Sequence, residues 1–244
     1  MFLLLLLVLP PSCISDQECG QISSALEKNL GNDLGSAETD SDGGGNRIIK
    51  GKDASAHAFP WQAQLILLNS NRGPKPTGIC GGAIISPLYL ITASHCVEGS
   101  GTSVKEVWLG RHDRDSGGSR YDVAQVFRHP GRPKAQDPDT DAHDMALISL
   151  TKAITYSDSI SPVCLPDSSS DSPEAGSKVV VSGWGQTNPE KTMTPTFPST
   201  LQYVVLDVIP MAKCKEIHSA KAPKPHEGST FCTLTPGKGV CKRE

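Results

Sequence analysis

The stretch from Gly78 to Glu98, GICGGAIISPLYLITASHCVE, constrains the fold of this chain more than any other. Cys80 and Cys96 bracket a run rich in Ile, Leu and Tyr, and His95 directly precedes the second cysteine. Such a run, bounded by Gly, Pro and Ser, is typical of β-strands. A histidine held by a neighbouring disulfide is a candidate for general-base catalysis, which needs a fixed ring.

Composition favours an all-β chain. The 244 residues include 23 glycines and 19 prolines, which suit many short strands joined by turns better than long helices. The length fits one large domain or two small ones. The net charge is −3 and no basic run occurs, so we expect no nucleic-acid partner.

The first 15 residues resemble a secretory signal peptide. Phe2 to Leu9 is apolar, and Pro10, Pro11 and small residues follow up to Ser15. No Lys or Arg precedes the run, so a buried N-terminal strand stays open as the alternative. The run is shorter than the roughly 20 residues that span a bilayer, and no later segment could cross one. We expect a secreted, extracellular protein without a membrane anchor.

Eight cysteines predict disulfides in a secreted chain. Cys13 would leave with the signal peptide. The seven that remain are an odd number, so one of them has no partner within this sequence: Cys19, Cys80, Cys96, Cys164, Cys214, Cys232 and Cys241.

Residues 16–47 read as an acidic propeptide. The segment up to Asn46 carries seven acidic residues and one lysine, and is rich in Gly and Ser. It cannot bury enough apolar surface to fold alone. It ends in Gly43-Gly44-Gly45-Asn46-Arg47, an exposed type of stretch that proteases cut.

From Phe59 onward, short apolar runs alternate with turn residues, as in sandwiches and barrels. The stretches 111–141 and 186–200 are expected to be long loops, and Met211 to His218 a short helix after Pro210. The predicted strands are Trp61 to Leu68, Ala83 to Ile85, Val104 to Leu109, Ala146 to Leu150, Lys178 to Val181 and Leu201 to Val208.

These features together resemble the trypsin- and chymotrypsin-like serine proteases, from Ile48 to the last residue. The histidine segment already described and Asp144-Met145-Ala146-Leu147 are similar to the two motifs that carry the family's base and carboxylate. Four further landmarks stand in the family's order: Arg47-Ile48-Ile49-Lys50-Gly51, Phe59-Pro60-Trp61-Gln62, Pro162-Val163-Cys164-Leu165-Pro166 and Ser182-Gly183-Trp184-Gly185.

The resemblance implies a double antiparallel β-barrel with the active site between the barrels. The expected organisation is a signal peptide (1–15), a propeptide (16–47) and a protease domain (48–244). The first barrel would cover about 48–163, and a second barrel, incomplete at its C-terminal end, about 164–244.

The resemblance also assigns chemistry. His95 would be the general base for a serine hydroxyl, and Asp144 would fix its tautomer and stabilise the imidazolium. Asp144 stands out from the nearby Asp137, Asp139 and Asp141 because a buried strand follows it at once. Those three are otherwise solvated loop charges.

Activation and disulfides follow from the same likeness. Cleavage after Arg47 by a protease with basic specificity would free the Ile48 ammonium to pair with a buried acid; a casual nick in a linker is the alternative. The family pairs Cys80 with Cys96. Cys19–Cys164, a bond from leader to domain, and Cys214–Cys232 are the further expected pairs.

Cys241 would remain without a partner. In the family its counterpart precedes the nucleophilic serine of a Gly-Asp-Ser-Gly-Gly motif by four positions, which leads here to position 245. We therefore expect this sequence to stop just before that motif. Gly239 occupies the position that determines substrate specificity, and with Val240 it predicts an apolar or narrow pocket.

The sequence thus predicts a secreted serine endopeptidase zymogen by family, acting on proteins or peptides and open to protease inhibitors. The chain as printed is expected to be an inactive fragment or truncated isoform. A non-catalytic homologue acting by binding is the alternative, and a non-functional product is a third possibility. No cofactor or metal is expected: calcium is disfavoured by Arg111, a cation where calcium-binding members carry a carboxylate.

Overall fold

Two antiparallel sheets carry the fold in the computed structural model. It describes residues 19, 20, 22, 27 and 30, and the ranges 51–133, 142–166, 172–186, 197–217 and 230–236. Arg47, Ile48, Gly239 and Cys241 lie outside the described residues, as do Asp137, Asp139 and Asp141.

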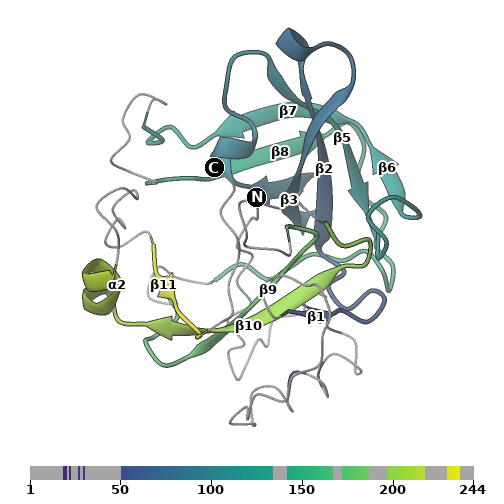
Figure 1. Ribbon diagram of the computed structural model, residues 1–244. Coiled ribbons are helices and arrows are strands. Elements are labelled where there is room, and N and C mark those ends of the chain that lie inside the picture. The colour runs from purple at the N-terminus through teal and green to yellow at the C-terminus, as the bar shows by residue number, and fades with distance from the viewer. Residues whose placement is uncertain are drawn as a thin grey trace.

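The larger sheet has seven strands and curls on itself (Figure 1). It contains β4 (Tyr89–Thr92), which ends just before His95, and β8 (Ala146–Leu150), which begins just after Asp144. Its strands, in spatial order, are β6 (Ser119–Tyr121), β5 (Thr102–Leu109), β2 (Gln62–Asn69), β3 (Pro76–Ser86), β4 (Tyr89–Thr92), β8 (Ala146–Leu150) and β7 (Val123–Arg128).

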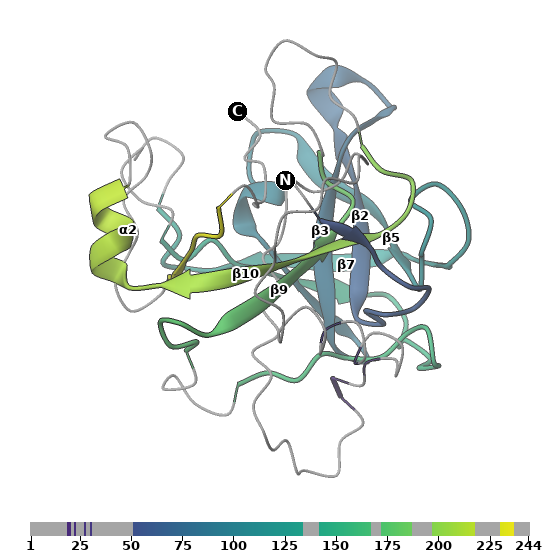
Figure 2. The same ribbon diagram turned by 60° about the horizontal axis from the view of Figure 1, so that its bottom comes forward.

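The smaller sheet has four strands and lies against one side of the larger one, as both ribbon views show (Figures 1 and 2). Strand β10 (Gln202–Ile209) pairs with β1 (Lys52–Asp53), β9 (Lys178–Gly183) and β11 (Cys232–Thr233). Other elements include the 3₁₀ turns η1 (Ser70–Arg72) and η2 (Ser94–Cys96) and the α-helix α2 (Met211–Ile217).

Side-chain patterning explains the strands. Strand β8 alternates buried and half-buried residues, as a strand with one face on the core must. In β9 the five residues after Lys178 are all buried, which is typical of a strand covered on both faces.

One packed core joins the two sheets. One cluster of buried residues contains side chains from both sheets. From the larger sheet come Leu65, Ile148 and Trp61, which directly precedes β2; from the smaller sheet come Val180 and Tyr203. Each fully buried large apolar side chain stabilises the fold by about 1.5–3 kcal/mol relative to exposure. A second cluster, of Val179, Val181, Val204, Leu206 and Val208, lies on the other face of the β9–β10 pair.

The prediction of an all-β chain is confirmed, the short helix predicted at Met211 to His218 corresponds to α2, and the six predicted strands correspond to β2, β3, β5, β8, β9 and β10. The prediction of a loop over 111–141 was wrong, because β6 and β7 lie within it. Strand β7 is exposed or half-buried throughout, so its sequence lacks the apolar alternation that marks a strand.

The leader contributes to the folded core. Leu30 is 2% exposed and belongs to the main cluster, and Ile22 packs against the same cluster. Gly20 donates its backbone N–H to the Pro162 carbonyl at 2.8 Å. Residues of a segment that cannot fold alone therefore pack against the core of the rest of the chain.

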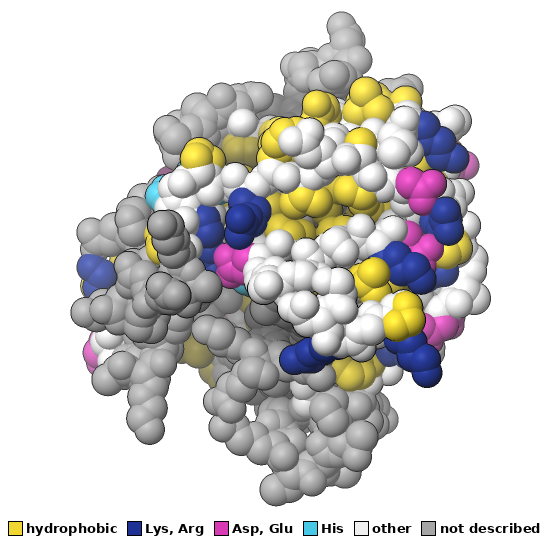
Figure 3. Space-filling view, turned by 90° about the horizontal axis from the view of Figure 1, so that it is seen from above, with side chains coloured by type: hydrophobic (Ala, Val, Ile, Leu, Met, Phe, Trp, Pro, Cys, Tyr) yellow, Lys and Arg dark blue, Asp and Glu magenta, His cyan; other side chains and the backbone are white. Residues whose placement is uncertain are grey.

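The face above the larger sheet is chemically mixed. Hydrophobic side chains gather in a hollow at its middle, and basic and acidic side chains are interspersed around it (Figure 3). Within the described part of the chain, no helix combines the length and apolar character needed to cross a bilayer.

Candidate active site

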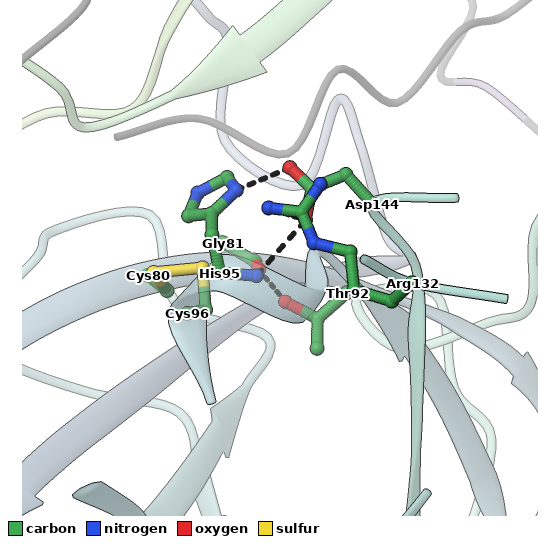
Figure 4. Close-up of a disulfide and its surroundings, with 7 residues drawn as sticks. All are labelled: Cys80, Gly81, Thr92, His95, Cys96, Arg132 and Asp144. Carbon is green, nitrogen blue, oxygen red and sulfur yellow. Dashed lines mark hydrogen bonds and ion pairs between the residues drawn. A yellow bond between two sulfur atoms is a disulfide. The ribbon is translucent and has the colours of Figure 1, made fainter. Parts of the chain in front are cut away.

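His95 sits on a turn that is anchored to strand β3. The turn η2 follows β4 directly, and its residues Ser94 and Cys96 are buried. Cys96 forms a disulfide with Cys80 of β3. At the end of β4 the Thr92 hydroxyl donates to the Gly81 carbonyl at 2.8 Å. The turn is thus bound to β3 covalently and by hydrogen bonding, and His95 projects from its free side (Figure 4).

Asp144 reaches His95 because of strand register. Thr92, the last residue of β4, pairs with Ala146, the first residue of β8. In an antiparallel pair the end of one strand meets the start of the other, so the residues just beyond Thr92 and just before Ala146 lie together. Two positions before Ala146, Asp144 stands in a turn closed by a 2.7 Å hydrogen bond from Met145 N–H to the His143 carbonyl.

Both oxygens of Asp144 contact His95. Oδ1 accepts the His95 backbone N–H at 2.9 Å, and Oδ2 is hydrogen-bonded to Nδ1 of the ring. The side chains of His95 and Asp144 are 22% and 23% exposed. The structure therefore brings together the two residues that the sequence singled out, although they are 49 positions apart.

The Asp144 carboxyl is held in its ionised form. Burial alone would raise its pKa, but the hydrogen bonds from the His95 ring and backbone, together with the charge of Arg132, outweigh burial and lower the pKa. An ionised carboxylate can only accept hydrogen bonds. Nδ1 of a neutral His95 must then carry the ring proton, which leaves the lone pair on Nε2.

Nε2 of His95 is buried and has no hydrogen-bond partner among the described residues. A buried nitrogen with a free lone pair is costly to leave unpaired. The arrangement is that of a base oriented by a carboxylate and ready to accept a proton.

Arg132 and Glu98 complete the surroundings of this pair, and sequence reasoning missed both. Arg132 Nη2 lies 3.0 Å from Glu98 Oε1 and 3.7 Å from Asp144 Oδ1. Arg132 falls within the stretch predicted as a loop, and no local pattern in the sequence links it to a glutamate 34 positions earlier.

Comparison with known proteins identifies the family. A sequence profile of the family named Trypsin matches residues 48–242. The chain belongs to the trypsin family. Human kallikrein-5 is 29% identical over 226 residues, which cover 89% of this chain and 69% of kallikrein-5. Mouse kallikrein 1-related peptidase b27 is 30% identical over 208 residues, which cover 81% of this chain and 72% of that protein.

Solved structures agree with the sequence comparison. Mouse neuropsin, described as a serine protease expressed in the limbic system, superposes with a TM-score of 0.61 at 26% identity, covering 77% of this chain and 74% of neuropsin. A structure named GrC gives a TM-score of 0.64 at 25% identity, covering 80% and 79%. The predicted family and its double-barrel fold of the chymotrypsin type are confirmed.

Disulfides join the cysteines of this trypsin-family chain as the resemblance implied. Besides Cys80–Cys96, the structure contains Cys19–Cys164 and Cys214–Cys232. Disulfides form and persist in oxidising compartments such as the extracellular space.

A Ser-containing segment similar to the family's nucleophile motif does occur, at Arg114-Asp115-Ser116-Gly117-Gly118. It lies in the β5–β6 hairpin, and Ser116 is exposed. His95 Nε2 is buried and makes no hydrogen bond to a described residue. The structure therefore does not join Ser116 to the base.

The same hairpin is organised around Arg111. Its guanidinium donates to Gln64 Oε1 at 2.5 Å, to the Arg114 carbonyl at 3.0 Å and to the Gly117 carbonyl at 3.1 Å. It also lies 3.7 Å from the centre of the Trp108 ring. Because these oxygens face a cationic side chain, the hairpin does not fit a calcium ion.

Proposed function

We propose that this chain is a secreted serine endopeptidase zymogen by family, in which His95 is the general base and Asp144 its orienting carboxylate. The observation that carries the proposal is the two-point contact between Asp144 and His95, to the ring Nδ1 and to the backbone N–H. That contact fixes both the tautomer and the direction of the ring.

In the proposed reaction Nε2 takes the proton of a serine hydroxyl as its oxygen attacks the carbonyl carbon of a peptide bond. The imidazolium that forms is stabilised by ionised Asp144 and then returns the proton to the leaving amine. Substrates are proteins or peptides. Gly239 and Val240 favour an apolar or small side chain before the cleaved bond.

Two further parts of the proposal concern activation. Cleavage after Arg47 by an activating protease would expose Ile48, separating propeptide 16–47 from domain 48–244 after the signal peptide 1–15 has been removed. The Cys19–Cys164 disulfide supports retention of the leader on the domain after that cut.

We further propose that the 244-residue chain forms no acyl-enzyme by itself, because its sequence contains no Gly-Asp-Ser-Gly-Gly motif. The test is labelling with a fluorophosphonate, which reacts with activated serines. We expect no labelling of the purified chain after cleavage at Arg47. Labelling that disappears in Ser116→Ala would contradict the proposal by identifying a nucleophile within this sequence.

A chimera tests the base itself. It carries residues 1–241 followed by the part of mouse kallikrein-8, a relative of 29% identity, that comes after the counterpart of Cys241. We expect the chimera to be labelled and its His95→Ala variant not to be. If the folded chimera also stays unlabelled, the non-catalytic homologue that acts by binding becomes the better description.

A further inference from the structure

Arg132 links the two turns that carry the proposed base and its carboxylate. It follows β7, and its side chain is only 12% exposed. Its guanidinium faces Glu98 through two atoms, with Nη2–Oε1 at 3.0 Å and Nε–Oε2 at 3.4 Å. Nη1 donates to the Ala142 carbonyl at 3.4 Å. Nη2 lies 3.7 Å from Asp144 Oδ1, and Figure 4 shows the guanidinium beside that carboxylate.

The partners of Arg132 belong to two different segments of the chain. Glu98 stands three residues after His95, just beyond η2, whereas Ala142 and Asp144 belong to the turn before β8. The Cys80–Cys96 disulfide lies on one side of the His95 turn and Arg132 on the other (Figure 4). The guanidinium therefore bridges the His95 segment and the Asp144 segment.

Exposed ion pairs contribute little to stability, but this pair is not exposed, since Glu98 is only 19% and Arg132 12% accessible. A two-point contact between guanidinium and carboxylate also fixes geometry, because the donors form a rigid planar fork. Arg132 is thus oriented by Glu98 before it meets Asp144.

We propose that Arg132 is a positioning residue for the His95–Asp144 pair: oriented by Glu98, it holds Oδ1 of Asp144 where the His95 backbone N–H meets it. This inference rests on the proposed function, because it matters only if His95 acts as a base. In this proposal Arg132 acts through Asp144 and not on the substrate.

The charge of Arg132 affects the pKa of Asp144 in a way that distinguishes this proposal from a purely structural bridge. Arg132 lowers the pKa of Asp144, so Arg132→Gln must raise it. Glu98→Gln removes an acid on the far side of the guanidinium and leaves more of the positive charge to Asp144, so it must lower that pKa further. If the pair were only a bridge, breaking it from either end would shift Asp144 in the same direction.

The experiment uses the 244-residue chain and needs no nucleophile. The side-chain carboxyl carbon of Asp144 is followed by ¹³C NMR as pH is lowered, over the range in which the amide spectrum remains that of the folded chain. Four variants are compared with the parent: Arg132→Gln, Arg132→Lys, Glu98→Gln and Arg120→Gln. Arg120 is the matched control, since it pairs with Asp122 and Glu106 at 54% exposure.

We expect protonation of Asp144 at higher pH in Arg132→Gln, at lower pH in Glu98→Gln, and no change in Arg120→Gln. Arg132→Lys keeps the charge without the fork, so it should stay closer to the parent than Arg132→Gln does. The stacked His129–His143 pair is common to all variants, so any effect it has on Asp144 cancels in the comparison.

A carboxyl that protonates in Arg132→Gln at or below the parent's pH would overturn the proposal, and so would shifts of equal sign in Arg132→Gln and Glu98→Gln. Failure of the proposed function is a separate result, because it is reported by fluorophosphonate labelling of the chimera.

Discussion

At the scale of single residues, Asp144 performs two tasks with its two oxygens. Oδ1 accepts the backbone N–H of His95 and so fixes the turn, while Oδ2 meets the ring and fixes the tautomer. The same contacts lower the pKa of Asp144 against the opposing effect of burial. The Asp144 side chain therefore both fixes the position of the His95 turn and supplies the negative charge beside the ring.

The stability contributed by Asp144 should depend on pH. Since its pKa is lowered by folding, the contribution is complete above the unfolded value, about 3.9, and is lost as pH falls through the folded value. Asp144→Ala should cost about 1–3 kcal/mol of unfolding free energy at neutral pH. In urea titrations the gap from the parent should narrow on acidification.

Asp122→Ala is the control for this prediction. Asp122 pairs with Arg120 at 2.8 Å, but the two side chains are 60% and 54% exposed. Its loss should cost less than about 1 kcal/mol. A gap between Asp144→Ala and the parent that stays constant from neutral pH to pH about 3 would contradict the linkage.

At the scale of elements, the site is built by the register of β4 against β8 and by the disulfide under η2. Register places Asp144 near the turn, and Cys80–Cys96 keeps the turn attached to β3. Neither the strand register nor the disulfide is itself a contact to the His95 ring. The geometry of the base should therefore depend on the Cys80–Cys96 bond.

Removal of that disulfide tests this dependence. The double variant Cys80→Ala/Cys96→Ala opens a loop of sequence separation 16, and a crosslink over about 15 residues contributes roughly 3 kcal/mol. We expect that loss in urea unfolding, together with faster hydrogen exchange of the His95 amide, because Asp144 would no longer meet a fixed turn.

The matched control is Cys214→Ala/Cys232→Ala, whose disulfide closes a similar separation of 18 far from the site, between α2 and β11. It should cost comparable stability and leave the exchange of the His95 amide, relative to global unfolding, as in the parent. Equal loss of His95 protection in both double variants would show that the Cys80–Cys96 bond has no specific role at the site.

At the scale of the whole molecule, the described residues of the acidic segment 16–47 belong to the folded body. Cys19 is bonded to Cys164, and Leu30 is buried in the main core. Gly20 has φ +67°, and a Cβ there would stand 2.9 Å from Cys164 Sγ. This close approach favours glycine, so Gly20 packs closely against the domain beside the disulfide.

Leu30→Ala should therefore destabilise the chain like a core substitution, by about 2–5 kcal/mol. Ile22, which is only partly buried, should cost less when changed to alanine. Both are measured by urea unfolding with the disulfides intact. A Leu30→Ala effect below about 0.5 kcal/mol, the usual size for a surface position, would contradict a structural role for the leader.

The sequence could predict what local patterns and family motifs encode. Apolar alternation predicted β8, and the strand that follows Asp144 distinguished it from neighbouring aspartates. Strand β7 could not be predicted, because an exposed strand carries little apolar pattern. Contacts between distant segments were also beyond local reasoning. The burial of Leu30 and the bridge from Arg132 to Glu98 depend on how turns far apart in the sequence meet after folding.

The most direct test of the central claim, that Asp144 orients His95 as a base, is the turnover of a peptide substrate by the activated chimera and its Asp144→Asn variant. Asparagine keeps the size of the side chain and its carbonyl acceptor, but it removes the charge and permits the wrong tautomer. In the chymotrypsin template the corresponding change lowers kcat about 10⁴-fold. We expect a loss of that order here, with folding unchanged. An Asp144→Asn chimera that turns over substrate within about tenfold of its parent would contradict the account.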